Sequence, residues 1–247
     1  MGNQGDKPMV SIIVPVMNEQ DNVLVLAQEI ERSMDGTPWK WECIWVDDGS
    51  TDRTAQRLME LAGASSYHRL IMHRKNYGQS AALATGFRHA RGEIFATLDG
   101  DGQNDPVSLP GLLEKLIEED AHMVNGWRER RQDSFIKRMA SRIGNGFRNL
   151  ITGDNIRDVG CALRVFRREC VEGVPVFKGM HRFFPTLVRL AGYTRILEMP
   201  VNHRKRHRGR TKYGIHDRLW VGMLDTLAVC WMMRRMVYPR IRETDQD

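Results

Sequence analysis

The sequence predicts an α/β protein built around a mostly parallel central sheet. Short runs rich in β-branched and aromatic residues alternate with longer segments whose apolar residues recur at helical spacing, which is the pattern of βαβ units. Acidic or polar clusters follow three of the strand-like runs, as at the ligand-binding edge of such a sheet. A chain of 247 residues is long enough to bury one substantial core.

The first half of the chain carries the clearest alternation. Val10–Val16 is a continuous β-rich run, as expected of a buried parallel strand. Segment 21–34 has apolar residues at helical spacing after a polar start, which predicts a capped helix. The other elements expected here, in chain order, are a strand at 42–46, a helix at 53–62, a strand at 69–73, a helix at 79–90 and a strand at 93–98.

The second half is less regular. Segment 128–150 is basic and amphipathic, which predicts a helix, and 203–212 is a loop with six Lys or Arg, two His and no acid. The other expected elements are a helix at 109–119, a strand at 122–127, a strand at 159–166 that returns to the sheet, and a helix at 217–235.

Composition and charge indicate which partners and which cellular compartment to expect. The net charge of +6 favours phosphorylated or polyanionic partners, but only weakly. The tryptophans form no stacking pattern with the basic residues, so we expect no nucleic-acid binding. The four cysteines form no CxxC pair, which indicates reduced thiols of a cytosolic protein. The N-terminus has no apolar stretch that could serve as a signal peptide.

The acidic clusters are the strongest indication of function. They are Asn18–Glu19, Asp47–Asp48 and the pair Asp99 and Asp101, which stand two residues apart in TLDGDGQNDP. Carboxylates on a glycine-loosened turn after a strand suit a hard divalent cation, although Asp and Gly also form ordinary turns. The chain has no GxxxxGK[ST] loop and no complete dinucleotide fingerprint. Phosphate binding would therefore rely on a metal and basic side chains, which suggests a nucleotide diphosphate held by a cation.

Eight motifs follow one another along the chain: PVMNE, VDDGSTDRT, NYGQSAALATGF, LDGDGQNDP, GWRERR, DVGCALRVFRR, HRFFP and HRKRHRGRTKYG. In this order they resemble glycosyltransferase family 2, whose members have the GT-A fold with helices on both faces of the sheet. Within the family the chain is most similar to the polyprenyl-phosphate branch, which includes dolichol-phosphate mannose synthase and undecaprenyl-phosphate sugar transferases. The resemblance covers roughly residues 9 to 233.

The resemblance implies a role for each matching residue. On the donor side, the residues expected to bind the nucleotide sugar are Pro15, Asn18, Glu19, Asp47, Asp48, Asp99 and Gly100. Asp99, Asp101 and Gln103 would hold a divalent cation, Mg²⁺ or Mn²⁺. The residues expected to bind phosphate or the acceptor are Arg128, Arg131, Arg204, Arg210, Lys212 and Tyr213. The residues expected to act in catalysis are Asp101, Arg128, Asp158 and Arg164.

The expected reaction is an inverting, metal-dependent transfer of a hexose or related sugar from a nucleotide-diphosphate sugar to a polyprenyl phosphate. A lipid phosphate is already an anion, so it needs positioning by arginine forks rather than a strong base. Two alternatives stay open. A hydroxyl of a lipid-linked or envelope glycan could be the acceptor, with Asp158 as the base. The chain could also be an inactive nucleotide-sugar-binding membrane adaptor, which the intact set Asp99, Asp101 and Gln103 disfavours.

The C-terminal segment, residues 217–235, has features of a helix that binds a membrane surface. Its longest uncharged run, residues 226–233, is too short to span a bilayer, which takes about 20 residues. Apolar residues fall on one helical stripe between flanking arginines, as in a helix that lies in the membrane interface; the stripe is Trp220, Met223, Leu224, Leu227 and Trp231. The alternative is a core helix packed on the catalytic domain. We expect peripheral association with the inner face of the cell membrane.

These expectations divide the chain into four parts. Residues 1–8 are a flexible N-terminus and 9–214 are the GT-A catalytic domain. Residues 215–239 form an amphipathic, membrane-interfacial helix, and 240–247 are a polar tail.

Overall fold

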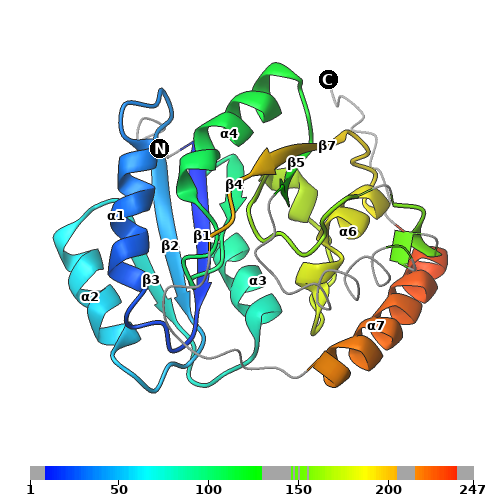
Figure 1. Ribbon diagram of the computed structural model, residues 1–247, viewed down its shortest axis with the longest axis horizontal. Coiled ribbons are helices and arrows are strands. Elements are labelled where there is room, and N and C mark those ends of the chain that lie inside the picture. The colour runs from blue at the N-terminus through cyan, green and yellow to red at the C-terminus, as the bar shows by residue number, and fades with distance from the viewer. Residues whose placement is uncertain are drawn as a thin grey trace, which may run out of the picture.

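The computed structural model describes residues 9–129, 146, 148–149, 151–154, 156–204 and 215–237. The described chain forms a sheet of seven strands in the order β3-β2-β1-β4-β6-β5-β7, with helices on both faces (Figure 1). Every strand pair is parallel except the two made by β6, which runs antiparallel to both β4 and β5. The mostly parallel α/β architecture is therefore confirmed.

The first half follows the predicted alternation closely. Its elements are β1 (Val10–Val16), α1 (Val23–Met34), β2 (Trp41–Asp47), α2 (Thr54–Ala64), β3 (His68–Met72), α3 (Gln79–His89) and β4 (Ile94–Thr97). The elements that follow are η2 (Pro106–Ser108), α4 (Leu109–Glu118), β5 (Met123–Arg128), β6 (Arg164–Arg167), η3 (Arg168–Val171), η4 (Met180–Arg182), α6 (Phe184–Leu190), β7 (Ile196–Val201) and α7 (Ile215–Arg235).

Two apolar layers hold the helices to the sheet. On one face, Leu26 and Ile30 of α1 and Leu112 of α4 pack with alternate residues of the strands. On the other face, Ala82 of α3 and Val188 of α6 belong to the second core cluster. Because β1, β2 and β4 are covered on both sides, their sequences are mostly apolar, which is why they could be predicted.

The strand predicted at 159–166 starts later than expected. The strand β6 begins only at Arg164. The buried Arg164 guanidinium donates hydrogen bonds to the carbonyl oxygens of Val159 and Cys161, so the intervening chain curls around its own side chain. The path of residues 159–163 therefore depends on a buried charge, which hydrophobic periodicity does not reveal.

The sequence analysis also missed β7 and α6. Within the described residues β7 is an edge strand that pairs with β5 alone, and it contains Pro200, a residue that argues against a strand. Pro200 is tolerated because it lies on the open edge. The predicted helix at 128–150 is not helical at its start, since residue 128 ends β5; residues 130–145 lie outside the described part of the chain.

Helix α7 lies along one side of the molecule beside α6 (Figure 1). Val229 is fully buried and packs with Met180, Phe183 and Leu187, as the alternative of a domain-packed helix predicts. Apolar residues also cover its outer side, where Leu224, Leu227 and Trp231 are 64%, 56% and 63% exposed. The helix thus carries apolar residues on both sides. Within the described residues, no helix has the length and apolarity needed to cross a bilayer.

Candidate active site at the carboxyl ends of the strands

The turn that follows β4 carries Asp99, Gly100 and Asp101, here called the acidic turn. It packs closely against the end of β1. A Cβ atom added to Gly100 would lie 2.5 Å from Cγ1 of Val16 and 3.1 Å from the carbonyl oxygen of Pro15. Only glycine permits this approach without displacing β1. The close contact brings Pro15 and Gly100 together and sets Asp99 and Asp101 on either side of it.

Asp99 is held by two hydrogen bonds. Its backbone N–H donates to Oδ1 of Asn104 at 3.2 Å, and its Oδ1 accepts a hydrogen bond from Nε2 of Gln79 at 2.7 Å. Burial and the neighbouring Asp101 carboxylate raise the pKa of Asp99 to about 7, against the opposing charges of Arg164 and Arg128. The turn therefore brings two carboxylates into mutual repulsion, and the guanidinium groups lie near enough to counter it.

Asp101 and Gln103 form the exposed side of the same turn. The Gln103 N–H donates to Oδ1 of Asp101 at 3.1 Å, and Arg204 N–H donates to the Gln103 carbonyl at 2.9 Å. In the described part of the chain, no three His, Cys, Asp or Glu residues cluster as a metal site. Two repelling carboxylates and one amide fit the kind of site in which Mg²⁺ or Mn²⁺ takes its remaining ligands from substrate phosphates.

The paired aspartates after β2 organise neighbouring loops. Asp48 accepts hydrogen bonds from the N–H groups of Tyr77 at 2.9 Å and Gly78 at 2.7 Å, and its Oδ1 lies 2.8 Å from Nδ1 of His73. Asp47 accepts hydrogen bonds from the Ser50 hydroxyl and backbone N–H. Both carboxylates are buried. Their hydrogen bonds therefore fix the loops that follow β2 and β3 at the carboxyl ends of the strands.

Asn18 and Glu19 tie the loop after β1 to the loop after β2. Asn18 has a left-handed backbone, with φ of 53°, and its Oδ1 accepts a hydrogen bond from Thr51 N–H at 2.8 Å. The Glu19 N–H donates to the Thr54 hydroxyl at 2.9 Å, and its buried carboxylate accepts a hydrogen bond from Asn22 at 2.6 Å. These contacts fix the two loops that flank the acidic turn.

Arg128 and Asp158 form a bidentate ion pair. Nε of Arg128 lies 2.6 Å from Oδ2 of Asp158, and Nη2 lies 2.9 Å from Oδ1. Both side chains are largely buried, at 14% and 8% exposed. Arg128 ends β5 on the same rim as Asp99, and Asp158 precedes the curl around Arg164. The pair therefore fixes the plane of one guanidinium group at the edge of the site.

Arg164 serves mainly to hold its surroundings. Beyond the carbonyls of Val159 and Cys161, its Nη1 lies 3.4 Å from the carbonyl oxygen of His181, and its guanidinium lies 5.6 Å from the ring centre of Phe184. Burial lowers its pKa, and the nearby Asp99 carboxylate opposes that shift. The side chain thus supplies a positive charge behind the acidic turn.

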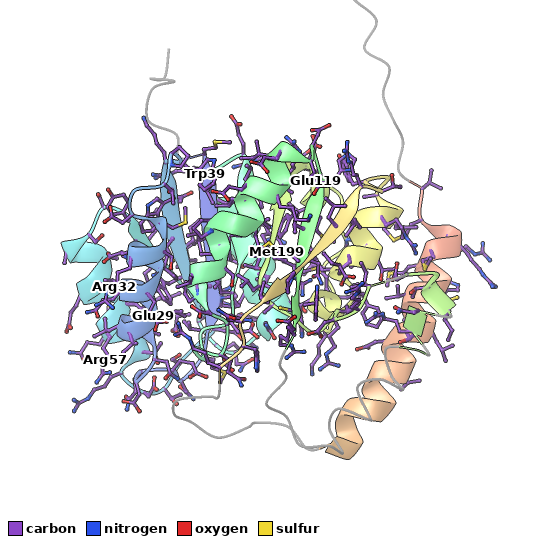
Figure 2. The ribbon with its side chains drawn as sticks, turned by 45° about the horizontal axis from the view of Figure 1, so that its top comes forward. Glu29, Arg32, Trp39, Arg57, Glu119 and Met199 are labelled. Atoms are coloured by element: carbon purple, nitrogen blue, oxygen red, sulfur yellow. The ribbon has the colours of Figure 1, made fainter. Side chains whose placement is uncertain are left out.

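Arg204 is held by two ion pairs. It pairs with Glu29 of α1 at 2.7 Å and with Asp105 at 2.6 Å, and Figure 2 labels Glu29 on that helix. These contacts fasten the start of the basic loop beside Gln103. The predicted phosphate-binding residues Arg131, Arg210, Lys212 and Tyr213 lie outside the described residues.

Sequence reasoning missed Gln79 as a member of this site. The only signal was its place in a quoted motif, directly after Gly78 at the start of α3. It also missed Ser80 and His181, whose Oγ and Nδ1 atoms lie 3.0 Å apart although 101 residues separate them in the chain.

Known proteins similar to this chain show which family it belongs to. The model of the family described as "Glycosyl transferase family 2" matches residues 11–174. The dodecaprenyl-phosphate galacturonate synthase of Rhizobium johnstonii is 36% identical over 93% of this chain and 69% of its own length. The undecaprenyl-phosphate 4-deoxy-4-formamido-L-arabinose transferase of Edwardsiella ictaluri is 36% identical over 83% of this chain. The match spans 63% of that relative, so this chain covers less than two thirds of its length.

Solved structures support the fold. Glucosyl-3-phosphoglycerate synthase from Mycobacterium tuberculosis, crystallised with Mn²⁺, uridine diphosphate and glucosyl-3-phosphoglycerate, matches with a TM-score of 0.68 and 18% identity. The match covers 92% of this chain and 80% of that one. The same enzyme with Mn²⁺, UDP-glucose and phosphoglyceric acid matches equally well, at a TM-score of 0.68. The family match, the relatives and the fold agree, and the chain belongs to glycosyl transferase family 2, with the GT-A fold of a glycosyltransferase.

Proposed function

We propose that the protein transfers a sugar from a nucleotide-diphosphate sugar to a polyprenyl phosphate, with inversion, at the cytosolic face of a membrane. The observation that carries this proposal is that the acidic turn and two guanidinium groups lie at one edge of the sheet. Arg164 pairs with Thr97 of β4 and with Asn125 of β5, so Asp99 and Arg128 both follow closely on the strand positions beside it. The printed names of the two curated relatives, which both act on polyprenyl phosphates, support the choice of acceptor.

On the donor side, Asp99, Asp101 and Gln103 would hold a divalent cation. When bound, that cation supplies Lewis-acid stabilisation of the charge on the departing diphosphate. Pro15, Asn18, Glu19, Asp47, Asp48 and Gly100 would line the nucleoside pocket through the loops described above. The two Mn²⁺-containing neighbours support a divalent cation, and Mg²⁺ and Mn²⁺ are both candidates.

On the acceptor side, Arg128 would face the incoming phosphate. Its bidentate pair with Asp158 sets the orientation of the guanidinium plane before the acceptor arrives, which lowers the cost of ordering it. Arg131, Arg210, Lys212 and Tyr213 would add phosphate contacts. Attack by the phosphate oxygen on the anomeric carbon forms the new C–O bond as the bond to the diphosphate breaks, and the configuration inverts.

The geometry disfavours the hydroxyl acceptor of the alternative reading. That reaction needs a carboxylate to remove a proton, and Asp158 is the candidate. Two charge-assisted hydrogen bonds from Arg128 stabilise Asp158 as the anion and occupy both of its oxygens. A carboxylate so engaged is a poor base, whereas an anionic phosphate acceptor needs none.

The proposal can be tested with labelled donors. Radiolabelled UDP- and GDP-sugars, undecaprenyl phosphate and Mn²⁺ should give a chloroform-soluble labelled product, and EDTA should abolish it. Label appearing only in an alkali-stable glycan would indicate a hydroxyl acceptor instead. Absence of transfer from every donor would favour the inactive adaptor.

We further propose that the outer side of α7 rests on the membrane. Leu224, Leu227 and Trp231 expose a continuous apolar side, and the exposed Arg234 and Arg235 follow it. An apolar helix side flanked by cations suits an interface with anionic lipid, where each basic residue adds about 1 kcal/mol. Peripheral attachment at this side would keep the enzyme near a lipid-borne acceptor.

We expect Trp231→Ala to weaken binding to phosphatidylglycerol vesicles about tenfold, because the indole supplies much of the exposed apolar area. Sedimentation of vesicles with the purified protein measures the effect. Met59→Ala on α2, which removes another half-exposed apolar side chain, serves as the matched control and should bind like the parent. Equal binding by Trp231→Ala and the parent would contradict the assignment of this side.

A further inference from the structure

A continuous series of contacts connects α7 with Asp99. We propose that η4 and the first turn of α3 form a positioning link between them, in which Gln79 is the positioning residue for Asp99. The inference rests on the proposed metal site, because it concerns how one of the residues of that site is held. Each step of the link is carried by a contact between described residues.

The inner end of the link is the bond from Gln79 to Asp99. Nε2 of Gln79 donates to Oδ1 of Asp99 at 2.7 Å. The backbone around Gln79 is itself fixed, because the preceding N–H groups of Tyr77 and Gly78 both donate to Asp48. The amide therefore reaches Asp99 from a rigid support, and it orients the carboxylate as a second layer of hydrogen bonds orients a metal ligand.

The middle of the link joins α3 to η4. The next residue along α3, Ser80, is buried; its Oγ lies 3.0 Å from Nδ1 of His181 and accepts a hydrogen bond from Gly179 N–H at 3.2 Å. Burial and the charges of Arg182 and Arg164 lower the pKa of His181 to about 3, so the ring is neutral near pH 7. The contacts of Ser80 thus tie the first turn of α3 to the 179–182 segment.

The outer end of the link is a close approach of α7 to the same segment. Gly179 has φ of 95°, and a Cβ atom added there would lie 2.6 Å from Oδ2 of Asp225. The same oxygen lies 3.8 Å from Nη1 of Arg182. Val229, one turn further along α7, packs on Met180. A shift of α7 would therefore move η4, and with it the support of Gln79.

The link makes a prediction about metal binding that does not depend on turnover. Gln79→Leu removes the donor and keeps most of the volume, and it should weaken Mn²⁺ binding about 10- to 100-fold, the usual effect of losing such a partner. Gln79→Glu keeps the shape without the donor and should weaken it at least as much in the absence of nucleotide. Gln56→Leu, which removes a glutamine bonded to Glu60 on the exposed side of α2, should bind Mn²⁺ like the parent.

The experiment measures Mn²⁺ dissociation constants of the full chain by electron paramagnetic resonance, alone and with UDP or GDP. Thermal melts select variants that remain folded. Asp101→Asn shows whether the proposed metal site is right, since unchanged Mn²⁺ binding in that variant would overturn the site itself. Loss of binding in Asp101→Asn together with parental binding in both Gln79 variants would overturn the link alone.

The outer end is tested by a double-mutant cycle. Asp225→Ala should weaken Mn²⁺ binding several-fold, and combined with Gln79→Leu it should cost little more than Gln79→Leu alone, because both act through one series of contacts. Val237→Ala, an exposed residue just beyond α7, is the control and should leave Mn²⁺ binding unchanged. Parental binding by Asp225→Ala, or independent effects in the double variant, would overturn the part played by α7.

Discussion

Asp101→Ala is expected to reduce turnover at least a hundredfold while leaving the fold intact. The side chain is half-buried and accepts a hydrogen bond from Gln103 N–H, and its charge raises the pKa of the neighbouring Asp99. Its loss should therefore cost little stability. It would remove a charged ligand of the cation, whose stabilisation of the leaving group is worth several kcal/mol, or a factor of roughly 10² to 10³.

Steady-state rates with saturating donor and a titration of Mn²⁺ measure this effect. Asp35→Ala, which removes an exposed aspartate at the end of α1, is the control and should keep parental rates and melting temperature. Near-normal turnover in Asp101→Ala would refute the metal role of the turn.

Asp158→Ala is expected to lower the free energy of unfolding by about 3 kcal/mol and also to impair catalysis. The substitution leaves the Arg128 guanidinium without its bidentate partner at a site where both side chains are largely buried. Removing one member of a buried pair typically costs about 3 to 5 kcal/mol, since the remaining charge stays desolvated. The guanidinium would also lose its orientation toward the acceptor, so the KM for undecaprenyl phosphate should rise.

Urea denaturation and acceptor titrations separate the two consequences. Glu119→Ala breaks a surface pair with Lys115 and is the matched control, with no resolvable change expected. Parental stability in Asp158→Ala would show that the pair contributes nothing to the fold.

Burial explains which elements of the fold could be predicted from the sequence. The strands β1, β2 and β4 could be predicted because burial on both faces leaves mostly apolar runs. The curl around Arg164 and the edge strand with Pro200 could not, since each depends on partners that are distant in sequence. Local sequence patterns indicate buried strands and turns. They do not indicate which carbonyl oxygens accept hydrogen bonds from a buried guanidinium group.

The same limit applies to the site. The acidic turn could be predicted because Asp99 and Asp101 stand two residues apart, directly after a strand-like run. Gln79 reaches Asp99 across 20 residues and is a common residue at a helix start, so nothing local marks it. The resemblance implies phosphate binding for Arg204; its ion pairs with Glu29 and Asp105 join residues too distant in sequence to be predicted.

The most direct test of the proposed reaction compares two acceptors that differ only in the phosphate. With one labelled nucleotide sugar and Mn²⁺, transfer to undecaprenyl phosphate and to undecaprenol is measured side by side. We predict a chloroform-soluble, acid-labile sugar phosphate from the first and no transfer to the second, because the proposed site orients an anion and Asp158, the candidate base, is paired with Arg128. Transfer to undecaprenol at a comparable rate would contradict the proposal.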